Sequence, residues 1–161
     1  MERRASLAQG RPPALLIKIS ALARGGGLWV VITALMAIRP GVLRRAAWDG
    51  LTAAALASGG TQVLNRVVSR PRPPAEHLPA HRALAHKPRT PSFPSSHSAV
   101  AAAFTTAATL RYPPTAVILA PLACSIAYVR VRTRAHWPTD VVGGIALGVA
   151  IGQLVRRCTP W

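Results

Sequence analysis

The sequence predicts an all-α fold, an integral membrane helical bundle of about five or six transmembrane helices forming one domain over residues 1–161. Half of the 161 residues are apolar, and the mean hydropathy is +0.28. The apolar residues lie in long runs rich in Ala, Val, Leu and Gly, with arginine-rich stretches between them. Because a membrane helix needs roughly 20 mainly apolar residues, these runs are typical of membrane spans.

The expected helices follow in chain order. Residues 1–13 form a flexible basic N-terminus, and the apolar segment 14–38 is interrupted by consecutive glycines. This interruption leaves open one broken helix or a surface helix followed by a short span. Four further segments are continuous, and their small residues favour close helix packing: 46–65, 96–111, 115–130 and 138–155.

The directions of these helices bring three separated stretches to one membrane face. The stretch NRVVSRPRP ends the helix 46–65, PSSH begins the helix 96–111, and RVRTRAHWPTD joins the last two helices. Residues 71–92 contain six prolines and no apolar periodicity, so they predict a loop over the same face. Arginines are divided almost evenly between the two sides, and the positive-inside rule therefore leaves the orientation open.

The charge of the chain raises the question of a nucleic-acid partner. The formal net charge is +16, from twenty Lys and Arg against four Asp and Glu. A nucleic-acid-binding protein would be equally basic, but it would not normally carry long apolar runs between its arginines. We therefore predict no nucleic-acid partner and a multi-pass protein of the cell membrane that contacts membrane lipids.

Neither the cysteines nor the loop histidines indicate a metal site. The two cysteines have no CxxC spacing and no neighbouring histidine pattern, so we expect unpaired thiols at Cys124 and Cys158. Nothing in the Pro-rich loop would hold its histidines in a metal-binding geometry, and no site is assigned to His77, His81 and His86.

The three stretches carry residues suited to metal-free phosphoryl transfer. His136 and Asp140 flank the start of a helix, where the carboxylate can bind one imidazole nitrogen and leave the other to attack phosphorus. The guanidinium of Arg130, six residues earlier, can bind two phosphate oxygens as a fork. The PSSH helix start offers backbone N–H groups to an anion, and His97 can protonate a leaving oxygen. Arg72, with its RPRP neighbours, lies at the end of the preceding helix.

Each stretch alone has a common structural explanation, such as helix capping or contact with lipid headgroups, so the interpretation depends on the set. The three motifs together resemble those of the type 2 phosphatidic acid phosphatase superfamily, also called lipid phosphate phosphatases. They are RP at a basic helix end, then PSxH, then R-x5-H-x3-D. The resemblance covers residues 65–140 by motif and about 46–155 by helix order.

The resemblance implies a membrane phosphatase that hydrolyses a lipid-linked phosphate or diphosphate through a phosphohistidine, with no metal and no cofactor. It implies the nucleophile His136, its orienting carboxylate Asp140 and the general acid and base His97. The phosphate would be bound by Arg72, Arg130, Ser96 and Asn65.

Three positions depart from the usual pattern of that superfamily. Asn65 stands where a lysine is common, Ser96 replaces a glycine, and Val129 replaces a serine. Only Asn65 removes a cation from the phosphate site, and an amide donates a weaker hydrogen bond than a charged group does. Arg66 and Arg70 are the nearby cations that could compensate.

The substrate remains open at the level of the sequence. Candidates include polyprenyl phosphates such as undecaprenyl diphosphate and decaprenylphosphoryl phosphoribose, together with phosphatidic acid and phosphatidylglycerophosphate. The alternative class is a catalytically weak or inactive lipid-phosphate-binding membrane protein, motivated by Asn65. The intact set of His97, His136 and Asp140 favours the enzyme. The sequence does not determine the membrane face of the site or the oligomeric state.

Overall fold

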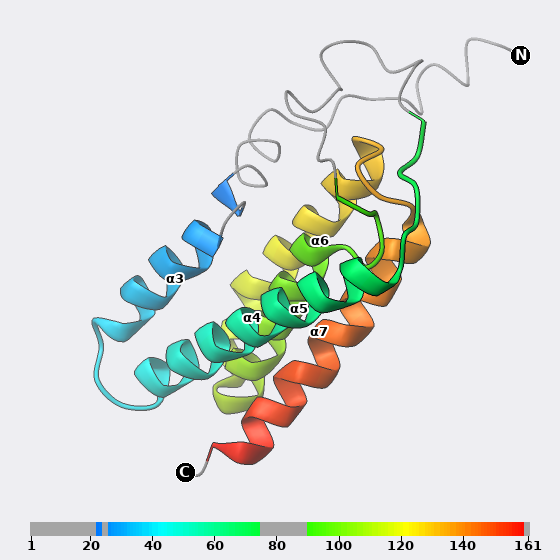
Figure 1. Ribbon diagram of the computed structural model, residues 1–161. Helices are drawn as coiled ribbons and strands as arrows, with labels where there is room; N and C mark the ends of the chain where they lie inside the picture. Colours follow the sequence, from blue (N-terminus) through cyan, green and yellow to red (C-terminus); the bar gives the residue numbers. More distant parts are fainter. Residues whose placement is uncertain (1–21, 24–25, 75–89, 160–161) are drawn as a thin grey trace, which may run out of the picture.

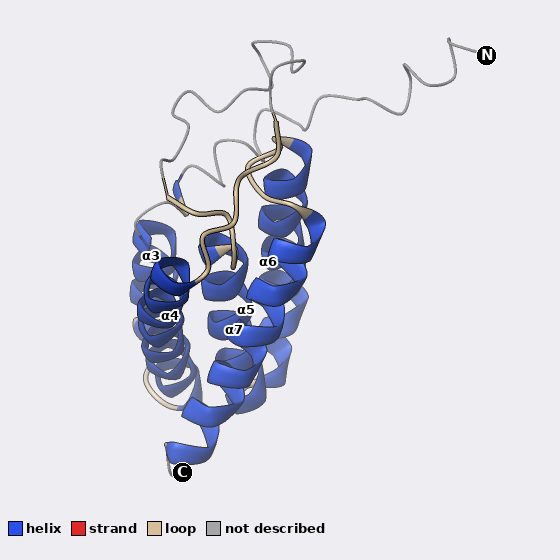
Figure 2. Cartoon of the chain, turned by 45° about the vertical axis from the view of Figure 1, so that its right-hand side comes forward, coloured by secondary structure: helices blue, strands red, loops and turns tan. Residues whose placement is uncertain are grey.

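The structure is a computed structural model that describes residues 22–23, 26–74 and 90–159. All regular structure in these residues is helical, which confirms the all-α prediction (Figure 2). Helices that follow one another in the chain run in opposite directions and form a bundle (Figure 1). The elements are α3 (Gly27–Ala37), α4 (Val42–Val67), α5 (Ser96–Arg111), the 3-10 turn η2 (Pro113–Thr115), α6 (Ala116–Arg132) and α7 (Pro138–Cys158).

Glycines with positive φ determine where the first two helices start. Gly26 has a φ of 83° and directly precedes α3, which therefore begins at Gly27, within the predicted segment 14–38. Gly41 has a φ of 99° and starts α4 four residues before the predicted segment. Only glycine adopts such values without steric cost, which is why these turns fall where they do. Residues 1–21 lie outside the described part.

Helix α4 ends two residues after the predicted segment 46–65 and before the RPRP sequence. Its last helical residue is Val67, and Val68 is already extended, with a φ of −101° and a ψ of 96°. The residue before a proline is disfavoured in the helical region, so Arg70, before Pro71, cannot continue a helix. Arg70 and Arg72 therefore lie in an extended segment rather than at a helix end, and this lets both side chains reach the start of α7.

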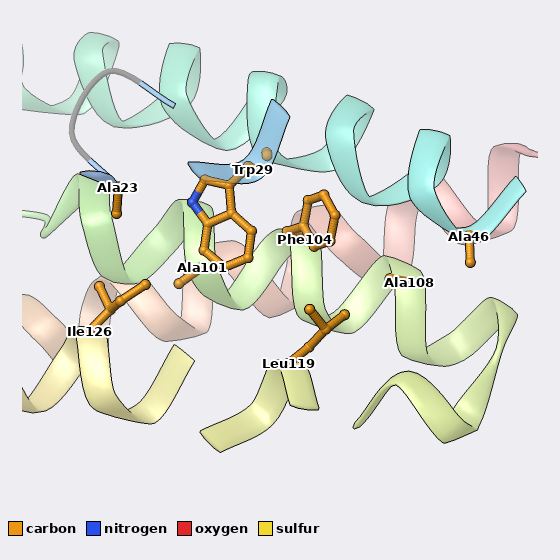
Figure 3. Close-up of a cluster of buried hydrophobic side chains, with 9 residues drawn as sticks. Ala23, Trp29, Ala46, Ala101, Phe104, Ala108, Leu119 and Ile126 are labelled. Carbon is orange, nitrogen blue, oxygen red and sulfur yellow. The ribbon is translucent and has the colours of Figure 1, made fainter. Parts of the chain in front are cut away.

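Two aromatic rings fill the centre of a core made mostly of alanine. The rings of Trp29 from α3 and Phe104 from α5 lie 4.8 Å apart between centroids, tilted by 34°. Figure 3 shows them between alanines of α4 and α5 and the aliphatic side chains of Leu119 and Ile126 from α6. Because alanine fills little volume, the helices pack closely and the two rings occupy the remaining space.

Glycines on α7 bring this helix directly against α5. Gly144, Gly148 and Gly152 recur every four residues and so share one face. A Cβ atom at Gly152 would lie 2.8 Å from the backbone oxygen of Ala103, and one at Gly148 would collide with the backbone oxygen of Ala99. This close packing fixes the start of α5 relative to the start of α7, where the predicted site residues lie.

A buried ion pair joins three helices at the end of the bundle away from these helix starts. Nε of Arg111 in α5 lies 2.7 Å from Oδ2 of Asp49 in α4, and both side chains are less than a tenth exposed. The same guanidinium donates to the hydroxyl of Thr159, directly after α7.

Two helices in the described residues are long and apolar enough to cross a membrane. They are Pro113–Arg132, with a mean hydropathy of 1.6, and Pro138–Cys158, with 1.5, whereas the apolar α3 has only 11 residues. Helix α5 has only 16 residues, and α4 contains charged residues, among them Arg44, Arg45 and Asp49, which lower its hydropathy. Two of the expected crossings thus meet these criteria of length and composition, and the total of five or six stays a prediction.

Candidate active site

The structure brings the three predicted stretches together at one end of the bundle (Figure 1). Nη1 of Arg72, after α4, donates to the backbone oxygen of Ala135 at 2.6 Å. The backbone N–H of Ser95, before α5, donates to the backbone oxygen of Asp140 at 3.0 Å. Residues from three parts of the sequence therefore share one set of hydrogen bonds, as the helix directions predict.

His136 is held by a backbone carbonyl rather than by the predicted carboxylate. Its Nδ1 lies 2.7 Å from the backbone oxygen of Ser92 and 3.9 Å from Oδ2 of Asp140. The carboxylate of Asp140 thus lies within ion-pair distance of the imidazole but makes no hydrogen bond to it in this structure. Because a carbonyl only accepts, Nδ1 must carry the proton, and Nε2 of the neutral ring keeps its lone pair. The orientation expected from Asp140 comes from Ser92 instead.

The surroundings of His136 favour its neutral form. Burial of the side chain, followed by the positive charge of Arg72, lowers the pKa of His136 to about 4. The hydrogen bond to Ser92 and the negative charge of Asp140 act in the opposite direction, and Arg130 lowers the pKa further. A neutral imidazole with a lone pair on Nε2 is the form that can attack an electrophile.

Asp140 is a fully buried carboxylate at the beginning of α7. Its Oδ2 accepts from the backbone N–H of Trp137, the N-cap residue, at 2.9 Å, which satisfies one donor at the helix start. Its Oδ1 accepts from Nη1 of Arg70 at 2.7 Å. Asp140 thus caps the helix and acts on His136 through charge at 3.9 Å, without a hydrogen bond.

The sequence does not reveal that Arg70 pairs with Asp140. Its Nη1 also donates to the hydroxyl of Thr139 at 2.8 Å, and its guanidinium lies 5.8 Å from the ring centroid of Trp137. These contacts fix Arg70 against the start of α7, so its charge serves Asp140 and is not available to replace a lysine at position 65. The other flanking cation, Arg66, is exposed on α4.

Arg72 lies beside the imidazole and is oriented by backbone oxygens. Its Nη1 is 3.4 Å from Nε2 of His136. Nε donates to the backbone oxygen of Thr90 at 3.0 Å, and Nη2 donates to the backbone oxygen of Pro91 at 3.3 Å. These partners hold a cation at the one imidazole nitrogen that is able to attack.

The end of α6 shapes the backbone around His136. The backbone oxygen of Arg130 accepts from the N–H groups of Ala135 and His136 at 3.1 and 3.3 Å. The chain turns at Arg134, whose φ of 48° is unusual for a residue with a side chain. The Arg130 side chain is only 4% exposed, and its charge is close enough to lower the pKa of His136.

Three further predicted site residues lie at the end of α4 and at the start of α5. They are Asn65, Ser96 and His97. Ser96 and His97 form the first turn of α5 and line one end of a cavity of about 470 Å³ between α3, α4 and α5. Asn65 belongs to the last turn of α4, and its Oδ1 is buried without a hydrogen-bond partner among the described residues.

The described residues contain no group of three His, Cys, Asp or Glu side chains that could hold a metal ion. His77, His81 and His86 lie outside these residues. Cys124 and Cys158 are both exposed and unpaired, as predicted. The charges near His136 come from Arg72, Arg130 and Asp140, so positive charge predominates, which suits an anionic substrate.

The geometry can be compared with known proteins. Residues 46–161 match the sequence profile of the PAP2 superfamily. The chain belongs to this superfamily. Members of the PAP2 superfamily are lipid phosphatases, so this PAP2 chain is a phosphatase and a membrane protein.

Several named phosphatases resemble this chain over part or most of their length. It is 35% identical over 133 residues to decaprenylphosphoryl-5-phosphoribose phosphatase from Mycobacterium tuberculosis, covering 79% of this chain and 69% of the relative. It is 33% identical over 91 residues to lipid A 1-phosphatase from Rhizobium etli, covering 53% and 38%. The crystal structure of a transmembrane PAP2-type phosphatidylglycerolphosphate phosphatase from Bacillus subtilis matches with a TM-score of 0.61 and 28% identity, covering 92% of this chain and 78% of that one.

Proposed function

We propose that the protein hydrolyses a lipid-linked phosphate monoester or diphosphate at the membrane surface through a phosphohistidine at His136. The observation that carries this proposal is the hydrogen bond between Nδ1 of His136 and Ser92, because it leaves the lone pair on Nε2. A buried, neutral and oriented imidazole beside an arginine is poorly explained by helix capping alone, whereas a nucleophile requires each of these properties.

In the first step, Nε2 of His136 attacks phosphorus, a P–N bond forms, and the bond to the leaving oxygen breaks. His97 gives its proton to that oxygen as it departs. In the second step, water attacks the phosphohistidine, His97 takes a proton from this water, and inorganic phosphate leaves with the P–N bond broken. His136 then returns to its neutral form, and no metal or other cofactor enters either step.

The remaining residues would bind the phosphate. Arg72 reaches the imidazole nitrogen that would attack, so its guanidinium can also contact the oxygens of a phosphoryl group there. Arg130 adds a second buried charge, and the first turn of α5 at Ser96 adds backbone N–H groups aimed at an anion. Asn65 would donate one hydrogen bond from its amide. Asp140 would act as a positioning residue, through Trp137 and through its charge.

The relatives narrow the substrate to lipids that carry a phosphate. Their names include a polyprenyl-linked phosphoribose, lipid A and phosphatidylglycerophosphate, and we propose a substrate of this kind, with its headgroup at the site and its apolar chain among the helices. We also propose that the five described α-helices, α3 to α7, all cross the membrane, so that the protein is multi-pass. A non-catalytic lipid-phosphate binder is the second candidate, because position 65 lacks a cation and Arg70 is engaged by Asp140.

A phosphate-release assay on the purified full chain in detergent distinguishes these functions. The panel contains phosphatidylglycerophosphate, phosphatidic acid, undecaprenyl diphosphate and decaprenylphosphoryl phosphoribose, each assayed with EDTA and without metal. We expect phosphate release from at least one lipid. Binding of these lipids without release from any of them would instead favour the non-catalytic binder.

A further inference from the structure

We propose that the cavity beside His97 receives a leaving group with hydroxyls next to the scissile oxygen. Ser58 and Gln62, which line the cavity, would recognise these hydroxyls together with Asn65, which follows the two lining residues on the same face of α4. The substrate class would be a lipid phosphate whose phosphate is carried by a glycerol or sugar headgroup, not by the apolar part of the lipid. The inference rests on the proposed function and narrows its substrate.

The position of the cavity assigns it to the leaving group. Ser96 and His97 line one end of it, and α3 and α4 form its other walls. Since His97 is the residue proposed to protonate the leaving oxygen, the atoms attached to that oxygen must extend on its side of the phosphate. The cavity begins there and has a volume of about 470 Å³, enough for a headgroup and the start of an apolar chain.

The cavity wall changes from polar to apolar with distance from His97. Gln62 and Ser58 lie on the part of α4 nearer to the site, and Leu51 and Ala54 lie further along the helix. From Gln62 to Leu51 the rise of an α-helix amounts to roughly 16 Å. Val30 of α3 adds to the apolar part. An amphiphile with a polar headgroup beside the phosphate and an apolar chain below it matches this gradient.

The polar side chains of this wall have hydrogen-bonding capacity to spare. Nε2 of Gln62 lies 3.5 Å from Oγ of Ser58, which is a long and weak contact. Asn65 follows on the same face of α4, because positions 58, 62 and 65 lie within about 60° of one another around an ideal helix. Oδ1 of Asn65 is buried and has no partner among the described residues. An apolar leaving group would exclude water from these atoms without replacing it, whereas a hydroxyl can donate to Oδ1 and to Gln62.

The wall also indicates the charge of the group it receives. Among the described residues that line the cavity, only His97 has an ionisable side chain. An ionised group directly next to the scissile oxygen would meet no charged partner among these residues, so the described wall fits uncharged hydroxyls at that position.

Two lipids with identical acyl chains test the inference. In dioleoyl phosphatidylglycerophosphate the leaving group has a free hydroxyl beside the scissile oxygen, and in dioleoyl phosphatidic acid the neighbouring oxygens are esterified. The kcat/KM of the full chain is measured for both in the same detergent micelles. We expect a preference of about tenfold or more for the first lipid, since sites built to bind a hydroxyl discriminate strongly against substrates without it.

Variants then assign the preference to the α4 wall. Gln62→Leu and Ser58→Ala are expected to lower the ratio of the two kcat/KM values by about fivefold or more, and Asn65→Leu is expected to lower the ratio as well as the rate on both lipids. The matched control is Val63→Leu, next to Gln62 in sequence, because the Val63 side chain is 58% exposed on the outside of α4. It should leave the ratio unchanged.

The outcomes separate this inference from the function on which it rests. Equal kcat/KM for the two lipids in the wild-type protein would overturn the inference and leave the phosphatase proposal intact, and this comparison needs no variant to fold. A wild-type preference that persists in both Gln62→Leu and Ser58→Ala would also overturn it. Absence of phosphate release from either lipid, with the rest of the panel inactive as well, would overturn both proposals.

Discussion

The backbone oxygen of Ser92 accepts a hydrogen bond from Nδ1 of His136 at 2.7 Å. A carbonyl cannot be protonated at ordinary pH and carries no full charge, so it fixes the tautomer of the imidazole without raising its basicity as much as a carboxylate would. The ring is thereby oriented by Ser92, while the negative charge of Asp140 lies 3.9 Å away and acts on the ring without a hydrogen bond. This arrangement leads to five predictions.

Replacement of the proposed nucleophile should abolish turnover. We expect His136→Ala to lose more than about a hundredfold in kcat, because water would have to attack in a site arranged for the imidazole. The wild-type protein, quenched in base after mixing with labelled substrate, should carry acid-labile phosphate that the variant lacks. Val142→Ala is the control, since Val142 is 65% exposed on α7. A variant that retains a tenth of the wild-type rate would contradict the covalent mechanism.

His136 should gain its proton only at low pH, because burial and the charge of Arg72 lower its pKa. Its pKa is lowered to about 4, so the ring should remain neutral as pH falls through 6.5 and gain its proton only near pH 4. Removing the Arg72 charge makes protonation easier, and Arg72→Gln should therefore raise the pKa. Nitrogen-15 NMR of histidine-labelled protein in detergent reports both values. A ring that titrates near 6.5 in the wild-type protein would be inconsistent with the buried site.

Loss of Arg70 should affect catalysis through Asp140. Arg70→Ala leaves a fully buried carboxylate without its cation, and we expect a fall in kcat of about tenfold together with a lower Tm. Arg70→Lys should recover part of both losses, because it restores the charge but not the fork. Arg66→Ala, at an exposed arginine of α4, should behave like the wild-type protein. Equal effects of the two alanine variants would show that only total charge matters.

Activity should persist in the presence of EDTA. The substrate phosphate is met by Arg72 and Arg130, which already supply the positive charge that a metal ion would otherwise provide. The assay compares phosphate release before and after chelation, with added Mg²⁺ as a separate arm. Activity that disappears on chelation and returns with a divalent ion would overturn the metal-free mechanism.

Packing between α5 and α7 should be sensitive to a single methyl group. Gly148→Ala places a Cβ against the backbone of Ala99, and backbone cannot move as a flexible side chain does. We expect a loss of about 1–3 kcal/mol in the free energy of unfolding, with lower kcat because the starts of the two helices shift. Gly59→Ala in α4 meets no atom within 4 Å and should be neutral or stabilising by up to about 1 kcal/mol. The measurements are thermal unfolding and phosphate release in the same detergent.

The sequence by itself determined the helices and the composition of the site. The boundaries of α5 agree with the prediction, and α6 and α7 differ by a few residues, because prolines, glycines and apolar runs act locally. The alternation of helix direction was enough to predict that His97, Arg130 and His136 reach one end of the bundle. Motif spacing was enough to indicate a phosphatase, and the family match agrees with it.

Only the tertiary structure decided which atoms pair. The partner of His136 is a backbone oxygen of Ser92, 44 positions away, and no side-chain pattern reveals such a partner. Arg70 binds Asp140 across 70 positions, a choice that depends on the early end of α4 and on the close approach of α5 to α7. The cavity beside His97 is formed by three helices whose separate sequences read only as apolar runs with a few polar residues. These features arise from packing between distant segments, where local preferences carry no information about which of several arginines or oxygens will meet.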